Sequence, residues 1–344
     1  MEQLTDGIEM LDLMIRPAFC VKNKIITRLN TPAAKLFLRE GLSLDQLLES
    51  GAQDYAAFSG GMLCLTLNLC GQSFGASVVR LGEEDVFTLD QQFECDQLRV
   101  LSLAARELRG PLSNAMLAAQ QLDCQDGNLS RLNRSLHQLL RIVGNMSDAS
   151  GISPVFHPEL QNIGALFQEI AEKAAALSGP SGITFSYSGL DEVVSCAVDR
   201  QMMERAVLNM VSNALKFTPA GGSIALELRR SGKQFRFSVT DSGSGIPEQE
   251  RSTLFTRYLR EPVIEDTRHG VGLGMLLIRS AAARHGGAVL VDCPKEAGTR
   301  VTMTFTSAPY SEARLRTNLL QADYAGEQDH ALIELSEFLP PEFY

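Results

Sequence analysis

Three features are scarce or absent in this 344-residue sequence, and each absence argues against a class of protein. The seven cysteines are scattered, with no Cys-x-x-Cys pair and no paired Cys/His spacing, which argues against a zinc site or a disulfide framework. Positive charge is in deficit: the formal net charge of -10 argues against a general binder of nucleic acid or anionic membranes. Long apolar runs are absent, so we expect no membrane span.

The rest of the composition is typical of a globular protein. Hydrophobic residues make up 44% and charged residues 21%, which is ample for packed cores, and the length suits two or three domains. The sequence begins MEQLTDGIEMLDLMIRP, which is acidic and lacks the basic start and apolar run of a signal peptide. We therefore expect free thiols and a cytoplasmic location.

Residues 1–90 are predicted to form a small α+β domain. Short strands are expected at 18–21 and 24–29, and a helix begins at Thr31-Pro32. Three further strands are expected at 62–69, 74–81 and 86–89. This order resembles a PAS-type sensor domain, although small sheets of this kind are common.

Residues 94–150 carry apolar residues at alternating spacings of three and four, which indicates a helical hairpin with one apolar seam on each helix. The expected seams are Leu98, Leu101, Ala105, Leu108, Leu112, Ala115, Ala119 and Leu122, then Leu129, Leu132, Leu136, Leu139, Val143 and Met146. Two such helices bury little alone, which favours a dimeric four-helix bundle over a hairpin packed on its own chain.

Residues 155–306 are predicted to be mixed α/β and contain three motifs that together suit a nucleotide. On a helix expected at 199–216, Asn209 and Asn213 lie four residues apart and project from one side, with Lys216 about one turn further on. Amide oxygens are suitable Mg²⁺ ligands, and an ammonium group suits a phosphate. A surface or capping role is the alternative for the two Asn alone.

The other two motifs are a turn and a loop rich in glycine. Asp241 ends a strand and can accept a hydrogen bond from an adenine amino group, while Gly243 and Gly245 allow the backbone to approach a flat base. Gly270, Gly272, Leu273 and Gly274 precede a helix, whose N-terminus can present N–H groups to phosphate. The intervening residues 247–269 suit a mobile lid.

Taken together, these motifs resemble the ATP-binding catalytic domain of sensor histidine kinases, a GHKL-type domain shared with gyrase and some heat-shock chaperone ATPases. The matching stretches are ERAVLNMVSNALKFTP, DSGSGIP, LFTRYLR (Leu254–Arg260), HGVGLGM and Gly298-Thr299. The resemblance implies an α/β sandwich in which Asn213 and Asn209 bind Mg²⁺, Lys216 approaches phosphate and Asp241 recognises adenine. Thr299 and the glycine-rich residues complete the implied ATP site. Gyrase-type enzymes have a Glu base where this chain has Asn209, so simple ATP hydrolysis is less expected.

The phosphoacceptor of that family is missing from the expected bundle. Residues 106–112, Arg-Glu-Leu-Arg-Gly-Pro-Leu, resemble the family motif His-Glu-Leu-Arg-Thr-Pro-Leu, with Arg106 at the histidine position beside Glu107, and Gly110 at the threonine. A protonated guanidinium has no lone pair with which to attack a phosphate. His137 on the second helix is expected to face solvent and is an alternative acceptor only by default, while His269 is expected to tune the nucleotide site or lid.

The overall expectation is a multidomain α+β protein with a PAS-like domain, a dimerising hairpin, an ATP-binding domain and an acidic tail at 307–344. We expect a dimeric, sensor-kinase-like protein that binds Mg-ATP, whose own histidine autophosphorylation is impaired or, as in a pseudokinase, absent. It would pair with another kinase or bind a response regulator. One alternative is a kinase that phosphorylates a residue of a partner protein. Another is an interaction scaffold with a vestigial ATP site. A short helix at 330–338 is expected in the tail, as either a free end or a docking segment.

Overall fold

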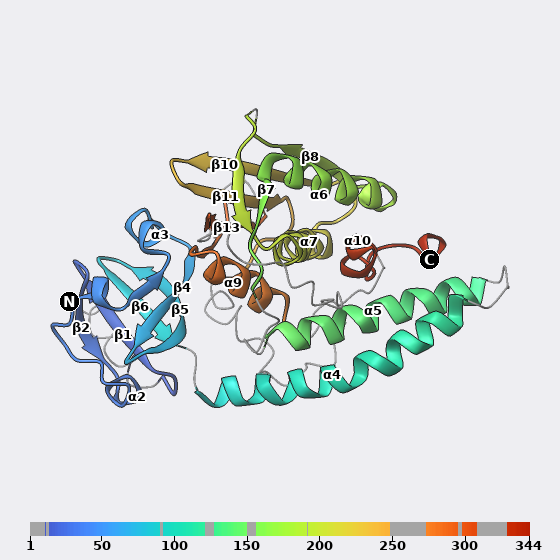
Figure 1. Ribbon diagram of the computed structural model, residues 1–344. Coiled ribbons are helices and arrows are strands. Elements are labelled where there is room, and N and C mark those ends of the chain that lie inside the picture. The colour runs from blue at the N-terminus through green and yellow to red at the C-terminus, as the bar shows by residue number, and fades with distance from the viewer. Residues whose placement is uncertain are drawn as a thin grey trace.

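The computed structural model describes residues 11, 14–89, 92–120, 127–149, 156–190, 192–247, 273–294, 298–307 and 329–344 (Figure 1). The fold is mixed α and β, as expected. Within these residues, no helix combines the length and the apolar character needed to cross a bilayer.

The N-terminal part is an antiparallel sheet with short helices. Its elements are β1 (Ala18–Lys22), β2 (Ile25–Leu29), α2 (Thr31–Ala34), η1 (Leu44–Gln46), β3 (Leu48–Ser50), α3 (Ala52–Ala56), β4 (Met62–Leu69), β5 (Gln72–Leu81) and β6 (Glu84–Leu89). Asn23 and Lys24 take positive φ angles and close the β1–β2 hairpin. Asn30, rather than Thr31, caps α2, because its side chain accepts a hydrogen bond from the Ala33 N–H. Five of these strands overlap the predicted ones, whereas β3 was not predicted.

Two long helices follow, α4 (Gln92–Gln120) and α5 (Gly127–Ala149), and they lie side by side as a hairpin (Figure 1). The predicted seam is only partly correct. The hydrophobic residues buried in the core of this hairpin are Ala105, Leu112, Met116, Ala119, Leu136, Leu140 and Val143. Leu108, Leu132 and Leu139, which we expected in the seam, are about half exposed, and Met116 and Leu140 are buried instead.

The remaining residues form a third part, called the ATPase part after the family that its motifs resemble. Its elements are β7 (Glu159–Asn162), α6 (Ile163–Ser178), η2 (Gly179–Ser181), β8 (Thr184–Ser188), β9 (Ser195–Val198), α7 (Arg200–Phe217), β10 (Ser223–Ser231), β11 (Gln234–Asp241), α9 (Gly274–Arg284), β12 (Val289–Asp292) and β13 (Arg300–Thr306). Helices α6, α7 and α9 pack against the strands, and Phe235, Phe237 and Val239, alternate residues of β11, enter the same core. After it come α10 (His330–Glu334) and η4 (Pro341–Phe343).

The N-terminal and ATPase parts share one sheet. Strands follow the order β2-β1-β6-β5-β4-β12-β13-β11-β10-β8, with β3 on β4, and β7 and β9 form a separate pair. Strand β4 pairs with β12 through Met62, Leu63 and Cys64. Beside this junction the buried Asp54 carboxylate accepts hydrogen bonds from Gln234 Nε2 at 3.0 Å and Thr304 Oγ1 at 2.9 Å. The sequence did not predict this continuity.

Candidate functional site

Helix α7 positions the three residues of the first motif. Asp199 caps it by accepting a hydrogen bond from the Met202 N–H, and one face of the helix enters the core. Asn209 is 1% exposed, and its amide nitrogen donates to the Arg205 carbonyl and to Glu334 Oε2, both at 3.0 Å. Asn213 is half-buried one turn later, with its amide nitrogen 3.6 Å from Met275 Sδ. The two Asn therefore face the start of α9.

Asp241 lies at the end of β11 with a buried carboxylate. Its Oδ1 accepts hydrogen bonds from the Gly243 N–H at 2.8 Å and the Thr299 N–H at 3.1 Å. Burial raises the pKa of this carboxyl, and the two backbone donors oppose the rise. Both hydrogen bonds are on Oδ1, so Oδ2 is the carboxylate oxygen available to a donor such as an amino group.

Three glycines allow the motifs to come together. A Cβ on Gly243 would overlap the Phe217 carbonyl at the end of α7, and a Cβ on Gly298 would overlap the Asp241 carbonyl. A Cβ on Gly274, the first residue of α9, would lie 2.9 Å from Asn209 Oδ1. The first two overlaps are with backbone atoms and require a residue without a side chain. The contacts bring Gly243 to the end of α7, Gly298 to Asp241, and Gly274 to Asn209.

Some of the remaining predicted residues of the site are described by the structure, and the others lie outside the described residues. Leu273 is buried and precedes α9, Thr299 is buried beside Asp241, and Gly245 adopts a φ of +73°. Lys216 lies in the last turn of α7, where its Nζ is 3.2 Å from Glu337 Oε1. Gly270, Gly272, His269, residues 254–260 and most of the predicted lid lie outside the described residues.

The acceptor position is on the exposed face of the hairpin. Arg106 and Glu107 are both exposed on α4, as the seam pattern predicts for Arg106. The prediction that His137 faces solvent was wrong. His137 is 7% exposed, its Nδ1 lies 2.8 Å from the Asn133 carbonyl oxygen, and its ring packs 4.7 Å from the ring of Tyr344.

Sequence reasoning missed a cluster of charged residues beside this site. Arg141 of α5 and Arg205 of α7 are buried or nearly so, and both contact Glu334 of α10. Arg141 also donates to Ser212 Oγ at 2.7 Å, which ties α5 to α7. The available signal was the apolar content of residues 331–335, four of which are apolar, which suits a docked rather than a free segment.

Comparisons with known proteins show what this part of the chain is similar to. Residues 198–309 match the family described as histidine kinase-, DNA gyrase B-, and HSP90-like ATPase. The adaptive-response sensory kinase SasA of Synechococcus sp. (strain CC9311) is 29% identical over 213 residues, covering 60% of this chain and 56% of that protein. Hybrid signal transduction histidine kinase D of Dictyostelium discoideum is 27% identical over 240 residues, covering 64% of this chain and 16% of that protein.

The chain thus spans only part of the length of these curated relatives. Among solved structures, full-length ShkA in complex with AMPPNP has a TM-score of 0.50 at 22% identity, covering 62% of this chain and 47% of that one. This likeness concerns the fold. Residues 198–309 are thus similar to the histidine kinase-, DNA gyrase B- and HSP90-like ATPase family, and about 60% of the chain is similar to sensor histidine kinases.

Proposed function

We propose that the ATPase part binds Mg-ATP and serves two-component signalling. Asn213 and Asn209 would hold Mg²⁺, Lys216 would approach the phosphates, and Asp241 would accept a hydrogen bond from the adenine amino group. The observation that supports this proposal is the set of close approaches of Gly243 to the end of α7, of Gly298 to Asp241 and of Gly274 to Asn209. The AMPPNP in the ShkA structure is consistent with it.

The test is calorimetric titration of the full chain with ATP, with and without Mg²⁺. We expect binding that depends on Mg²⁺, and we expect Asn213→Ala to remove that dependence because it deletes an oxygen ligand. Binding that is equally strong without Mg²⁺ would contradict the metal assignment.

We further infer that the hairpin does not accept phosphate at the usual position. Arg106 is exposed where a phosphoacceptor would stand, but its guanidinium is not a nucleophile. Incubation with labelled ATP should leave no acid-labile phosphate on the chain. Labelling that disappears in His137→Ala would overturn this inference. If the hairpin accepts no phosphate, the protein would act by binding a response regulator or another kinase.

The hairpin and the N-terminal part fit supporting roles. Large apolar side chains that are 45–57% exposed follow both helices, which supports a dimer that buries them; they are Leu103, Leu108, Leu117, Leu132 and Leu139. The strand order β2-β1-β6-β5-β4 of the N-terminal sheet supports a PAS-like sensor. Both assignments are part of the proposal.

A further inference from the structure

The segment of residues 329–344, hereafter the C-terminal segment, is docked beside the proposed ATP site. It carries Asp329, Glu334, Glu337 and Glu342 and no Lys or Arg. Helix α10 lies between α5 and α7 (Figure 1). Ile333 is fully buried in the hairpin core, and Ala331 and Leu335 are fully buried in the core of the ATPase part. The apolar residues therefore fix the segment in place.

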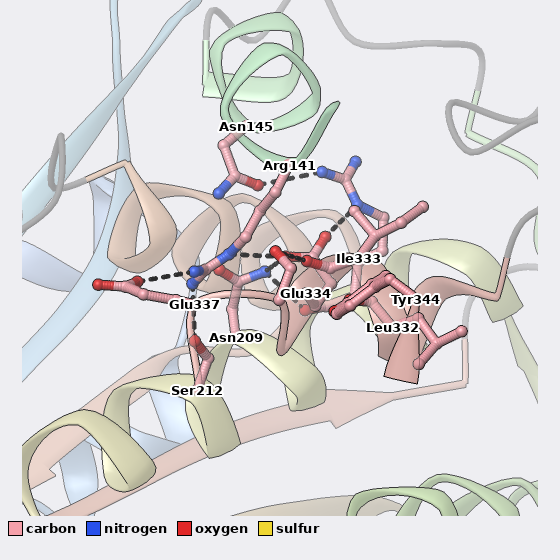
Figure 2. A network of polar contacts seen from close by, with 11 residues as sticks. Arg141, Asn145, Asn209, Ser212, Leu332, Ile333, Glu334, Glu337 and Tyr344 are labelled. Atoms are coloured by element: carbon pink, nitrogen blue, oxygen red, sulfur yellow. Dashed lines mark hydrogen bonds and ion pairs between the residues drawn. The ribbon is translucent and has the colours of Figure 1, made fainter. Parts of the chain in front are cut away.

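Glu334 is fully buried and contacts Asn209, one of the two residues proposed to bind Mg²⁺. Its Oε1 lies 3.1 Å from Arg205 Nε, and its Oε2 lies 3.4 Å from Arg141 Nε (Figure 2). The same Oε2 accepts the hydrogen bond from the Asn209 amide. A buried carboxylate is tolerated only when it is paired and hydrogen-bonded, and this one has both kinds of partner.

Glu337 contacts Lys216, the residue proposed to approach the phosphates. Its Oε1 is 3.2 Å from Lys216 Nζ, and its Oε2 is 2.9 Å from Arg141 Nη1. Lys216 is the cation of α7 that the proposed function assigns to a phosphate. Two carboxylates of one segment therefore lie on the two α7 side chains expected at the phosphate end of the nucleotide.

Backbone and aromatic contacts hold the rest of the segment on α5. Arg134 donates to the carbonyl oxygens of Ser336 and Glu337 at 3.1 and 2.8 Å. The Tyr344 ring covers His137, and its hydroxyl donates to the Leu332 carbonyl at 2.6 Å. These contacts are specific to the segment's conformation, which distinguishes it from a loosely attracted acidic chain.

We propose that the C-terminal segment is an intramolecular ligand that competes with Mg-ATP for the phosphate end of the site. Glu337 takes the Lys216 ammonium, and Glu334, bonded to the Asn209 amide nitrogen, fixes the segment on α7. A triphosphate brought to Lys216 would meet the Glu337 carboxylate and find its cation already paired, so docking of the segment and binding of nucleotide oppose each other. This inference rests on the proposed function of the same site. A partner that withdraws the segment would raise the affinity for ATP.

The test compares the Mg-ATP affinity of full-length variants by calorimetry. The double variant Glu334→Gln/Glu337→Gln should bind Mg-ATP about tenfold or more tightly than the unmodified chain, because a site that is competent only one-tenth of the time loses that factor in affinity. Glu337→Gln alone should give a smaller gain. Glu337 is only partly buried, so this variant keeps the test valid if the double variant misfolds.

Glu342→Gln is the matched control, since it removes the same charge from an exposed position of the same segment. Its affinity should equal that of the unmodified chain. Equal affinity in all four proteins would overturn the competition while leaving ATP binding intact, whereas no binding in any of them would overturn the proposed function as well.

Hydrogen exchange provides an independent readout. Saturating Mg-ATP should release the amides of 329–344 from protection in the unmodified chain, because nucleotide and segment exclude each other. Protection that is unchanged at saturation would refute the proposal.

Discussion

Asp241→Asn is the substitution that tests the adenine assignment most directly. The amide keeps the shape of the carboxylate, and its oxygen can still accept the Gly243 and Thr299 N–H groups. The position of Oδ2 becomes an NH₂ donor, which would meet the adenine amino group donor to donor. Loss of a hydrogen bond to a charged group is worth about 1.5–3 kcal/mol, so the affinity for ATP should fall about 10- to 150-fold.

Calorimetry with ATP and ITP provides the assay and its internal control. ITP lacks the amino group, so the unmodified chain should prefer ATP and the variant should lose that preference. Burial raises the pKa of Asp241, so ATP affinity of the unmodified chain should decline on acidification at a higher pH than for an ordinary Asp. The variant should lack this decline. An unchanged ATP affinity together with an unchanged preference over ITP would refute the reasoning.

Three further predictions concern the glycine contact, the sheet junction and the hairpin. Gly298→Ala should lower the melting temperature and abolish ATP binding. Gly221 has the same left-handed φ but no neighbour within 4 Å, so Gly221→Ala should reduce the free energy of unfolding only by the conformational cost of about 1–2 kcal/mol. Burial raises the pKa of Asp54, so the stability that this group contributes is present at low pH and is lost as pH rises through that pKa. In urea unfolding, the stability of the unmodified chain relative to Asp54→Asn should therefore increase from pH 7 towards pH 4. Leu139→Glu should reduce the mass measured by light scattering from dimer to monomer, while Leu81→Glu, at an equally exposed position on β5, should not.

The ATPase part was predictable because its motifs carry local chemistry. Asn209 and Asn213 share a side of α7 by helical periodicity alone, and a glycine-rich stretch before an apolar helix indicates the start of α9 wherever the rest of the chain goes. The need for Gly298 beside Asp241 was less accessible. The two residues lie far apart in sequence, and the overlap that excludes a side chain exists only in the folded chain.

The hairpin shows where periodicity stops being sufficient. A three-four pattern identifies the apolar residues of a helix, but both α4 and α5 carry more of them than one seam can cover. His137 was placed in solvent for the same reason, since its burial comes from Tyr344, more than two hundred residues away in sequence. Which segment packs on a given face of a helix is decided by the tertiary fold, and no local pattern in α5 encodes it.

The pairing of β4 with β12 has a mechanical consequence. A flexible linker between two domains lets each rotate alone, but strands joined by a hydrogen-bonded ladder twist together. The N-terminal strands and the ATPase strands are thus one hydrogen-bonded sheet, with Asp54 bonded to Gln234 and Thr304 beside the junction. We expect a twist applied at β1 to reach β13, next to Thr299, through this sheet and without passing along the helices that connect the two parts in sequence.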